Sequence, residues 1–101
     1  MNIVHGGRGS GKTTRLIQKI KEFGGVLLVS SETIKKNLIA GEVLTKDQVL
    51  TFREAMSVSG NFVSSNKKYY IDCMELFIEK FVGPGCIGFS IDTPNFERAK
   101  L

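Results

Sequence analysis

The chain has 101 residues, a net charge of +4, and 42% hydrophobic and 24% charged residues. This length predicts one small domain over residues 1–101, and no apolar run approaches the roughly 20 residues that a membrane span needs. Cys73 and Cys86 are too few and too widely spaced for a metal quartet or a disulfide scaffold, so two reduced thiols are expected. The sequence opens on a strand-like segment rather than a leader, which predicts a cytoplasmic location.

The first expected strand, Asn2–His5, runs directly into a glycine-rich loop. Gly6–Thr13 has the spacing G-x-x-x-x-G-K-[ST], and an amphipathic helical pattern follows it. In such a loop, glycines let backbone N–H groups turn toward a polyphosphate, while the lysine amine meets phosphate and the threonine hydroxyl meets Mg²⁺. The predicted ligands of a nucleotide are Gly7, Arg8, Gly9, Ser10, Gly11, Lys12, Thr13 and Thr14. The alternative is a glycine-rich turn that binds nothing.

Strand-like and helical segments alternate along the rest of the chain, which predicts an α/β fold with a mostly parallel, five-stranded sheet. The further expected strands are Val26–Val29, Val49–Phe52, Tyr69–Asp72 and Cys86–Ile91. The expected helices are Lys12–Phe23, one that Ser30 or Ser31 caps and Gly41 ends, a short one at Glu54–Met56, and one in which Met74, Phe77, Ile78 and Phe81 recur at helical spacing. Residues 57–66 are expected to form a flexible loop, and residues 93–101 a polar tail.

Asp72 stands at the end of the fourth expected strand, where open α/β sheets bind ligands. A carboxylate in this position commonly holds Mg²⁺ beside a phosphate loop, so Thr13 and Asp72 are the predicted metal ligands. The alternative is that Asp72 caps the next helix.

Hydrolysis also needs a group that positions or deprotonates water. Cys73 cannot do this at neutral pH without strong activation, and Glu75 is one helical turn beyond Asp72. The candidate catalytic residues are therefore Lys12, Asp72 and Glu75, and the sequence supports nucleotide binding better than turnover.

The basic residues are scattered along the chain as Lys19/Lys21, Lys35/Lys36, Lys67/Lys68 and Arg98/Lys100. Such a distribution fits either a nucleic-acid partner or ordinary solvated helix faces, and both interpretations stay open.

Five segments, taken in order, resemble the first RecA-like domain of superfamily-one helicases. They are Gly6–Thr13, Val29–Ser31, Thr51–Glu54, Ile71–Glu75 and Gly88–Asp92. The whole chain also looks like small phage- and prophage-encoded P-loop ATP-binding proteins, which share the opening Gly-Arg-Gly-Ser-Gly-Lys-Thr-Thr-Arg-Leu. The resemblance implies a three-layer P-loop NTPase domain of RecA-like type that binds ATP with Mg²⁺. It also implies a weak or partner-activated ATPase in phage-type DNA metabolism, located in the host cytoplasm if the chain is phage-encoded.

Two departures from the helicase pattern matter. Cys73 stands where that family has its catalytic glutamate, and the chain has no room for a second RecA-like domain, so a helicase acting alone is not expected. The rival functions are a non-catalytic nucleotide-binding or DNA/protein-binding module and a small thymidine-kinase-like phosphoryl transferase. That kinase family's zinc-binding cysteines and Asp-Glu-Ala-Gln segment are absent.

The implied order of strands places Cys86–Ile91 between Asn2–His5 and Tyr69–Asp72, and leaves the phosphate-loop strand at an uncovered edge of the sheet. We therefore expect self-association, or docking on DNA or a phage replication or recombination protein, through residues 2–9 and the tail. No membrane partner is expected.

Overall fold

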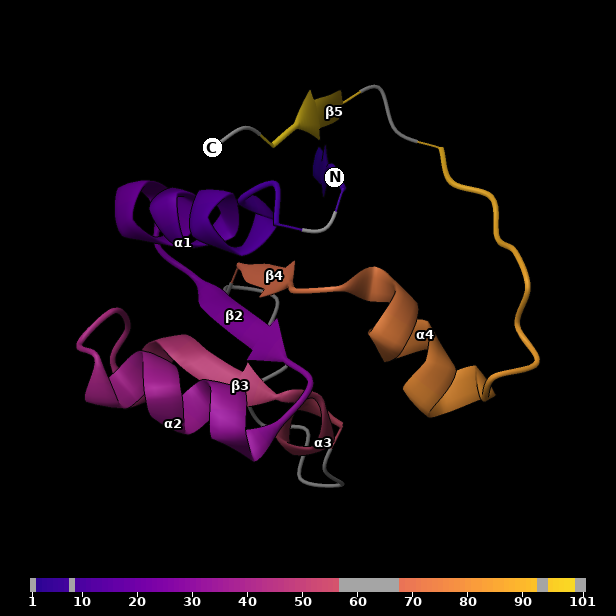
Figure 1. Ribbon diagram of the computed structural model, residues 1–101. Helices are drawn as coiled ribbons and strands as arrows, with labels where there is room; N and C mark the ends of the chain where they lie inside the picture. The colour runs from indigo at the N-terminus through magenta and orange to yellow at the C-terminus, as the bar shows by residue number, and fades with distance from the viewer. Residues whose placement is uncertain (1, 8, 57–67, 93–94, 100–101) are drawn as a thin grey trace.

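The computed structural model describes residues 2–7, 9–56, 68–92 and 95–99. Its elements are β1 (Asn2–His5), α1 (Lys12–Phe23), β2 (Val26–Val29), α2 (Glu32–Ala40), the 3-10 turn η1 (Lys46–Gln48), β3 (Val49–Thr51), α3 (Phe52–Ala55), β4 (Tyr69–Ile71), α4 (Met74–Val82) and β5 (Asn95–Arg98). All described strand pairs are parallel, in two sheets with the orders β1-β5 and β3-β2-β4. The predicted α/β class with parallel strands is confirmed, but the five described strands are divided over two sheets (Figure 1).

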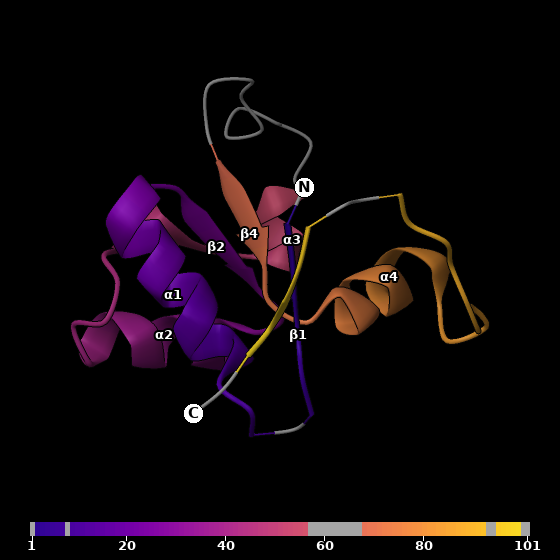
Figure 2. The ribbon, with the colours of Figure 1, turned by 90° about the horizontal axis from the view of Figure 1, so that it is seen from above.

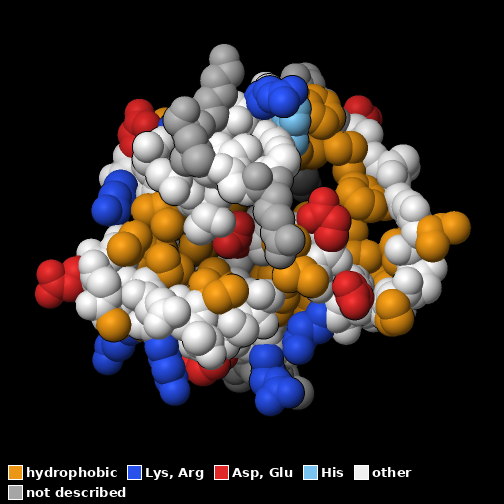
Figure 3. All heavy atoms as spheres, viewed as in Figure 1, with side chains coloured by type: hydrophobic (Ala, Val, Ile, Leu, Met, Phe, Trp, Pro, Cys, Tyr) orange, Lys and Arg blue, Asp and Glu red, His pale blue; other side chains and the backbone are white. Residues whose placement is uncertain are grey.

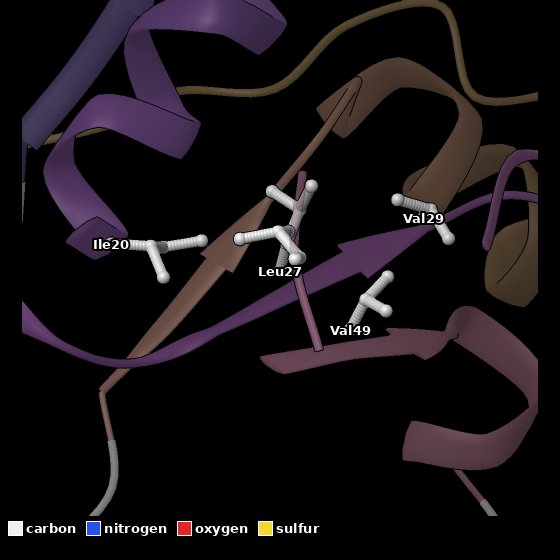
Figure 4. Close-up of a cluster of buried hydrophobic side chains, with 5 residues drawn as sticks. Ile20, Leu27, Val29 and Val49 are labelled. Atoms are coloured by element: carbon white, nitrogen blue, oxygen red, sulfur yellow. The ribbon is translucent and has the colours of Figure 1, made fainter. Parts of the chain in front are cut away.

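The core is built around β2, whose four residues are all buried. This confirms the prediction that a continuous apolar run forms a strand covered on both faces. On one face, helices α1 and α2 pack on a cluster that consists of Ile20, Leu27, Val29, Leu44 and Val49 (Figure 4). On the other face, α3 and α4 contribute to a second cluster with Val26, Leu28, Phe52 and Ala55, against which Phe77 packs.

Short polar signals set the ends of the helices. Ser31 caps α2 through a hydrogen bond from Ile34 N to its Oγ, 3.2 Å long, which is one of the two caps that the sequence predicted. Thr51 caps α3 in a capping box with Glu54, and this reciprocal pair of hydrogen bonds ends β3 one residue before the predicted boundary. Gly24, with φ +77°, closes α1 as expected.

The predicted strand at Cys86–Ile91 is wrong. Residues 86–92 carry no strand pairing and are mostly exposed, with Ile87 100% accessible, and apolar side chains gather on this side of the molecule (Figure 3). The strand forms later, at β5, within the segment that the sequence assigned to a polar tail. β5 pairs with β1 over all four residues and so takes the place beside β1 that the prediction gave to Cys86–Ile91.

Strand β5 is the partner of the phosphate-loop strand. It pairs with β1 over all four residues, from Asn2 with Asn95 to His5 with Arg98, and the two strands lie side by side (Figure 2). The edge of β1 that was predicted to pair with Cys86–Ile91 therefore pairs with β5 instead, and among the described residues β1 has no second partner strand. The predicted flexible loop at 57–66 lies outside the described residues.

Across the described ranges, no helix has the length and apolar character that crossing a membrane requires.

Candidate phosphate and metal site

The glycine-rich loop joins the end of β1 to the start of α1. Gly9 and Gly11 have φ values of +75° and +90°, a region that side-chain-bearing residues rarely adopt, so both positions depend on glycine. Gly11 precedes α1 and offers it no side-chain cap, and the first turn of α1 carries no acidic residue. The free N–H groups and the positive dipole end of this 12-residue helix therefore face the loop, and no acidic residue in the first turn of α1 neutralises them.

The Lys12 side chain folds back over the loop. Its Nζ donates hydrogen bonds of 2.8 Å to the carbonyl oxygens of Gly6 and of Gly7. Lys12 is half-buried against its own loop. Since its acceptors are neutral carbonyls, the amine can exchange them for an anion without breaking an ion pair.

Thr13, in the first turn of α1, meets Asp72, which directly follows β4, although 59 positions separate them in the sequence. The Thr13 hydroxyl lies 3.0 Å from Oδ1 and 3.1 Å from Oδ2 of Asp72. Asp72 is fixed by its backbone, because its N–H donates to Leu28 O at 2.9 Å and so extends β4 along β2. The structure thus brings together the two residues that the sequence proposed as metal ligands.

Burial raises the pKa of the Asp72 carboxyl, while the hydrogen bond from Thr13 and the charge of Lys12 act in the opposite direction without cancelling the rise. A hydroxyl and a carboxylate are oxygen ligands of the kind that Mg²⁺ prefers. Among the described residues, no group of three or more His, Cys, Asp or Glu side chains could hold a metal. Two such ligands are too few for a metal held by protein alone, so an ion bound by Thr13 and Asp72 would need its other oxygens from a ligand or from water.

Glu75 is not brought into this group. Its side chain is exposed, and its Oε2 accepts a hydrogen bond from Cys73 Sγ at 3.5 Å. Cys73, with φ +68°, occupies the N-cap position of α4 without a side-chain capping hydrogen bond, so the alternative role of Asp72 as the cap is not what forms. The position directly after Asp72 therefore holds an exposed thiol rather than a carboxylate.

The remaining loop residues have different environments. Ser10 Oγ is buried and has no hydrogen-bond partner among the described residues. A Cβ on Gly6 would lie 2.3 Å from this oxygen, so Gly6 is required by close packing rather than by its backbone angles. Gly7 accepts a hydrogen bond from Ser10 N at 3.1 Å, and Thr14 is exposed. Arg8 lies outside the described residues.

Sequence reasoning missed Glu97, which lies on β5 and contacts α1. Its carboxylate accepts hydrogen bonds from the Arg15 guanidinium and pairs with Lys19 Nζ at 3.1 Å. The hydrogen bond from Arg15, followed by the one from Lys19, lowers the pKa of Glu97. The only local signal was two cations one helical turn apart, and nothing in the sequence indicated which carboxylate would meet them.

Comparison of the chain with known protein families, with curated proteins and with solved structures found no match.

Proposed function

We propose that this chain is a P-loop nucleotide-binding domain that binds ATP, or a related nucleoside triphosphate, together with Mg²⁺. The observation that carries the proposal is the contact between the Thr13 hydroxyl and both carboxylate oxygens of Asp72, beside a loop whose lysine is held only by carbonyl groups. A glycine turn without a ligand would need neither a distant carboxylate nor a lysine in this place.

Each residue has one task in the proposed complex. The Lys12 amine leaves the carbonyls of Gly6 and Gly7 for the phosphates, and the loop N–H groups and the start of α1 add further donors. Thr13 and Asp72 hold the metal, whose charge neutralises the phosphate oxygens. All these groups lie at the carboxyl ends of parallel strands, where ligands bind in open α/β sheets.

The finer fold assignment belongs to the same proposal. The two described sheets, β1-β5 and β3-β2-β4, would belong to one layer of a three-layer P-loop NTPase. Support comes from the parallel pairing of all described strands and from helices on both faces of β2. The RecA-like type of this layer rests on the sequence resemblance, because the strand expected between β1 and β4 does not form at residues 86–91. The resemblance to small phage-type P-loop proteins supports a place in phage DNA metabolism, with DNA, a second copy or a replication or recombination protein as partner.

Hydrolysis is proposed to be slow in the isolated chain. The carboxylate of Glu75 is engaged with the Cys73 thiol, and Cys73 occupies the place next to Asp72. Since phosphoryl transfer to water needs a group that orients the water, a partner would have to supply it or the charge that offsets the transition state. The same observation favours the second candidate, a module in which bound nucleotide is not hydrolysed.

The first test is titration of ATP in excess Mg²⁺ into the wild type and Lys12→Ala. A charge-assisted contact to phosphate contributes about 1.5–3 kcal/mol, so Lys12→Ala should bind ATP at least about tenfold more weakly while the fold is retained. Lys21→Ala is the matched control, because it removes an exposed cation from the last turn of the same helix. Equal affinities of the wild type and Lys12→Ala would refute the nucleotide site.

The second test separates the metal from the phosphates. Asp72→Asn keeps an acceptor for Thr13 but removes the charge, so Mg²⁺ should no longer strengthen ATP binding. Binding in EDTA should not weaken, because the substitution removes a negative charge beside the phosphates. Asp47→Asn, an exposed acid on η1, should retain the Mg²⁺ effect. An undiminished Mg²⁺ effect in Asp72→Asn would remove Asp72 from the metal site.

A further inference from the structure

Strand β5 supports the phosphate loop from outside. It pairs with β1 along its length, and the pairing continues beyond the strand, because Ala99 N donates to His5 O at 2.7 Å. His5 is the residue directly before the loop. Ala99 is buried, and its Cβ would lie 3.6 Å from a Cβ placed on Gly6. The backbone at the N-terminal end of the loop, directly after β1, is therefore held by β5.

The C-terminal end of the loop, where α1 begins, is held by the same strand through one side chain. Glu97, which stands opposite Val4 in the register, reaches α1 and binds both Arg15 and Lys19. Arg15 Nη2 lies 3.4 Å from Glu97 Oε1, and Lys19 is only 8% exposed. Because a buried ammonium is costly without its counter-ion, Glu97 is what allows α1 to lie against β5 with Lys19 inside.

Another ion pair of the same kind provides a comparison. Lys35 Nζ on α2 lies 2.7 Å from Glu54 Oε1 on α3, and its side chain is about as buried as that of Lys19. This pair joins elements that flank neither end of the loop. Effects of Glu97 on the loop can therefore be separated from the general effect of losing an ion pair.

We propose that Glu97 is a positioning residue of the phosphate site: by tying α1 to the strand that also holds β1, it fixes the two ends of the Gly6–Lys12 loop relative to each other. The effect of Glu97 on ATP affinity rests on the proposed function. Its effect on the arrangement of the loop can be measured without a nucleotide. The C-terminal strand thereby controls how well the loop is arranged before its ligand arrives.

The experiment compares Glu97→Gln with the control Lys35→Gln at a temperature where circular dichroism shows both to be fully folded. Amide hydrogen exchange is first measured without nucleotide. We expect faster exchange at residues 9–15 in Glu97→Gln than in the wild type, with no such change in Lys35→Gln. Equal exchange at these residues in both variants would overturn the positioning role, whether both rise or neither does.

Titration with Mg²⁺-ATP provides the second readout. A loop that is misplaced by a fraction of an ångström loses part of its pre-arranged contacts, so Glu97→Gln should bind about threefold or more weakly, and Lys35→Gln as the wild type. If Glu97→Gln binds as tightly as the wild type, the positioning role fails and the nucleotide site stands. If the wild type itself does not bind, the proposed function fails, and the exchange at residues 9–15 alone decides the role of Glu97.

Discussion

At the scale of single residues, the most consequential side chain is the one directly after Asp72. Cys73 has a left-handed backbone, stands at the N-cap position of α4 and is exposed, and its thiol donates to Glu75. A thiol in this setting cannot orient water as a carboxylate does. Under the proposed function, this position therefore limits hydrolysis more than the phosphate loop does.

A substitution at this position tests that statement. Cys73→Glu should raise steady-state ATP hydrolysis by at least about tenfold, since a positioned general base contributes roughly 10²–10⁴. Nucleotide affinity should change little, because Cys73 touches neither Lys12 nor Thr13 among the described contacts. Phosphate release is the measurement, and Cys73→Gln, of similar size but without charge, should stay at the wild-type rate. A wild-type monomer that already hydrolyses ATP rapidly would show that another group positions the water.

At the scale of elements, α2 and α3 are joined by Glu54. Its carboxylate accepts from Lys35 Nζ at 2.7 Å and from Thr51 N at 2.9 Å. Burial opposes ionisation of Glu54, but the hydrogen bonds from Lys35 and Thr51 outweigh it, so the pKa of Glu54 lies below its usual value. A lowered carboxyl pKa stabilises the fold above the pKa of the unfolded chain, and this contribution is lost as the pH falls through the folded-state pKa.

Glu54→Gln isolates that charge, because glutamine can still complete the capping box with Thr51. At pH 7 the variant should be less stable than the wild type by a few tenths to about 1 kcal/mol, as expected for a partly exposed ion pair. The difference should shrink as the pH falls from about 5 toward 3, where the wild-type carboxyl takes up its proton. Urea unfolding at several pH values measures it, and a difference that stays constant down to pH 3 would contradict the assigned cause.

The elements also differ in how far the sequence determines them. Strand β2 and the caps at Ser31 and Gly24 follow from local patterns, namely a buried apolar run, a side-chain acceptor and a positive φ angle. The same holds for the loop and for Asp72, because strand ends at one edge of a parallel sheet converge. Strand β5 has no such pattern, since its residues are mostly exposed and its partner is at the other end of the sequence. Glu97 was missed for the same reason.

In segment 86–91, by contrast, a local pattern predicted a strand that does not form. Its alternation of apolar with small or polar residues is typical of a half-buried strand. The pattern gives the spacing of side chains but not the strand with which a segment pairs. Here β5 occupies the position beside β1, and Ile87, Phe89 and Ile91 are exposed.

At the scale of the whole molecule, the apolar side chains of α4 and of residues 86–91 form an exposed surface. Ile87 buries nothing, so Ile87→Asp should change the free energy of unfolding by less than about 0.5 kcal/mol. Ile20→Ala, at a residue that is 1% exposed, should cost about 2–5 kcal/mol and serves as the comparison. Urea unfolding measures both, and a loss above 2 kcal/mol in Ile87→Asp would place residues 86–91 inside a sheet after all.

The pairing of β1 with β5 also bears on the order in which the molecule folds. It joins Asn2 with Asn95, whereas β2 meets β3 by joining Leu27 with Val49. Closing the longer loop costs more chain entropy, and contacts between distant parts of a sequence form slowly. The three-stranded sheet is therefore expected to form first and the β1–β5 pair afterwards. The phosphate loop, which the second pair supports, would be among the last parts of the protein to reach its native arrangement during refolding.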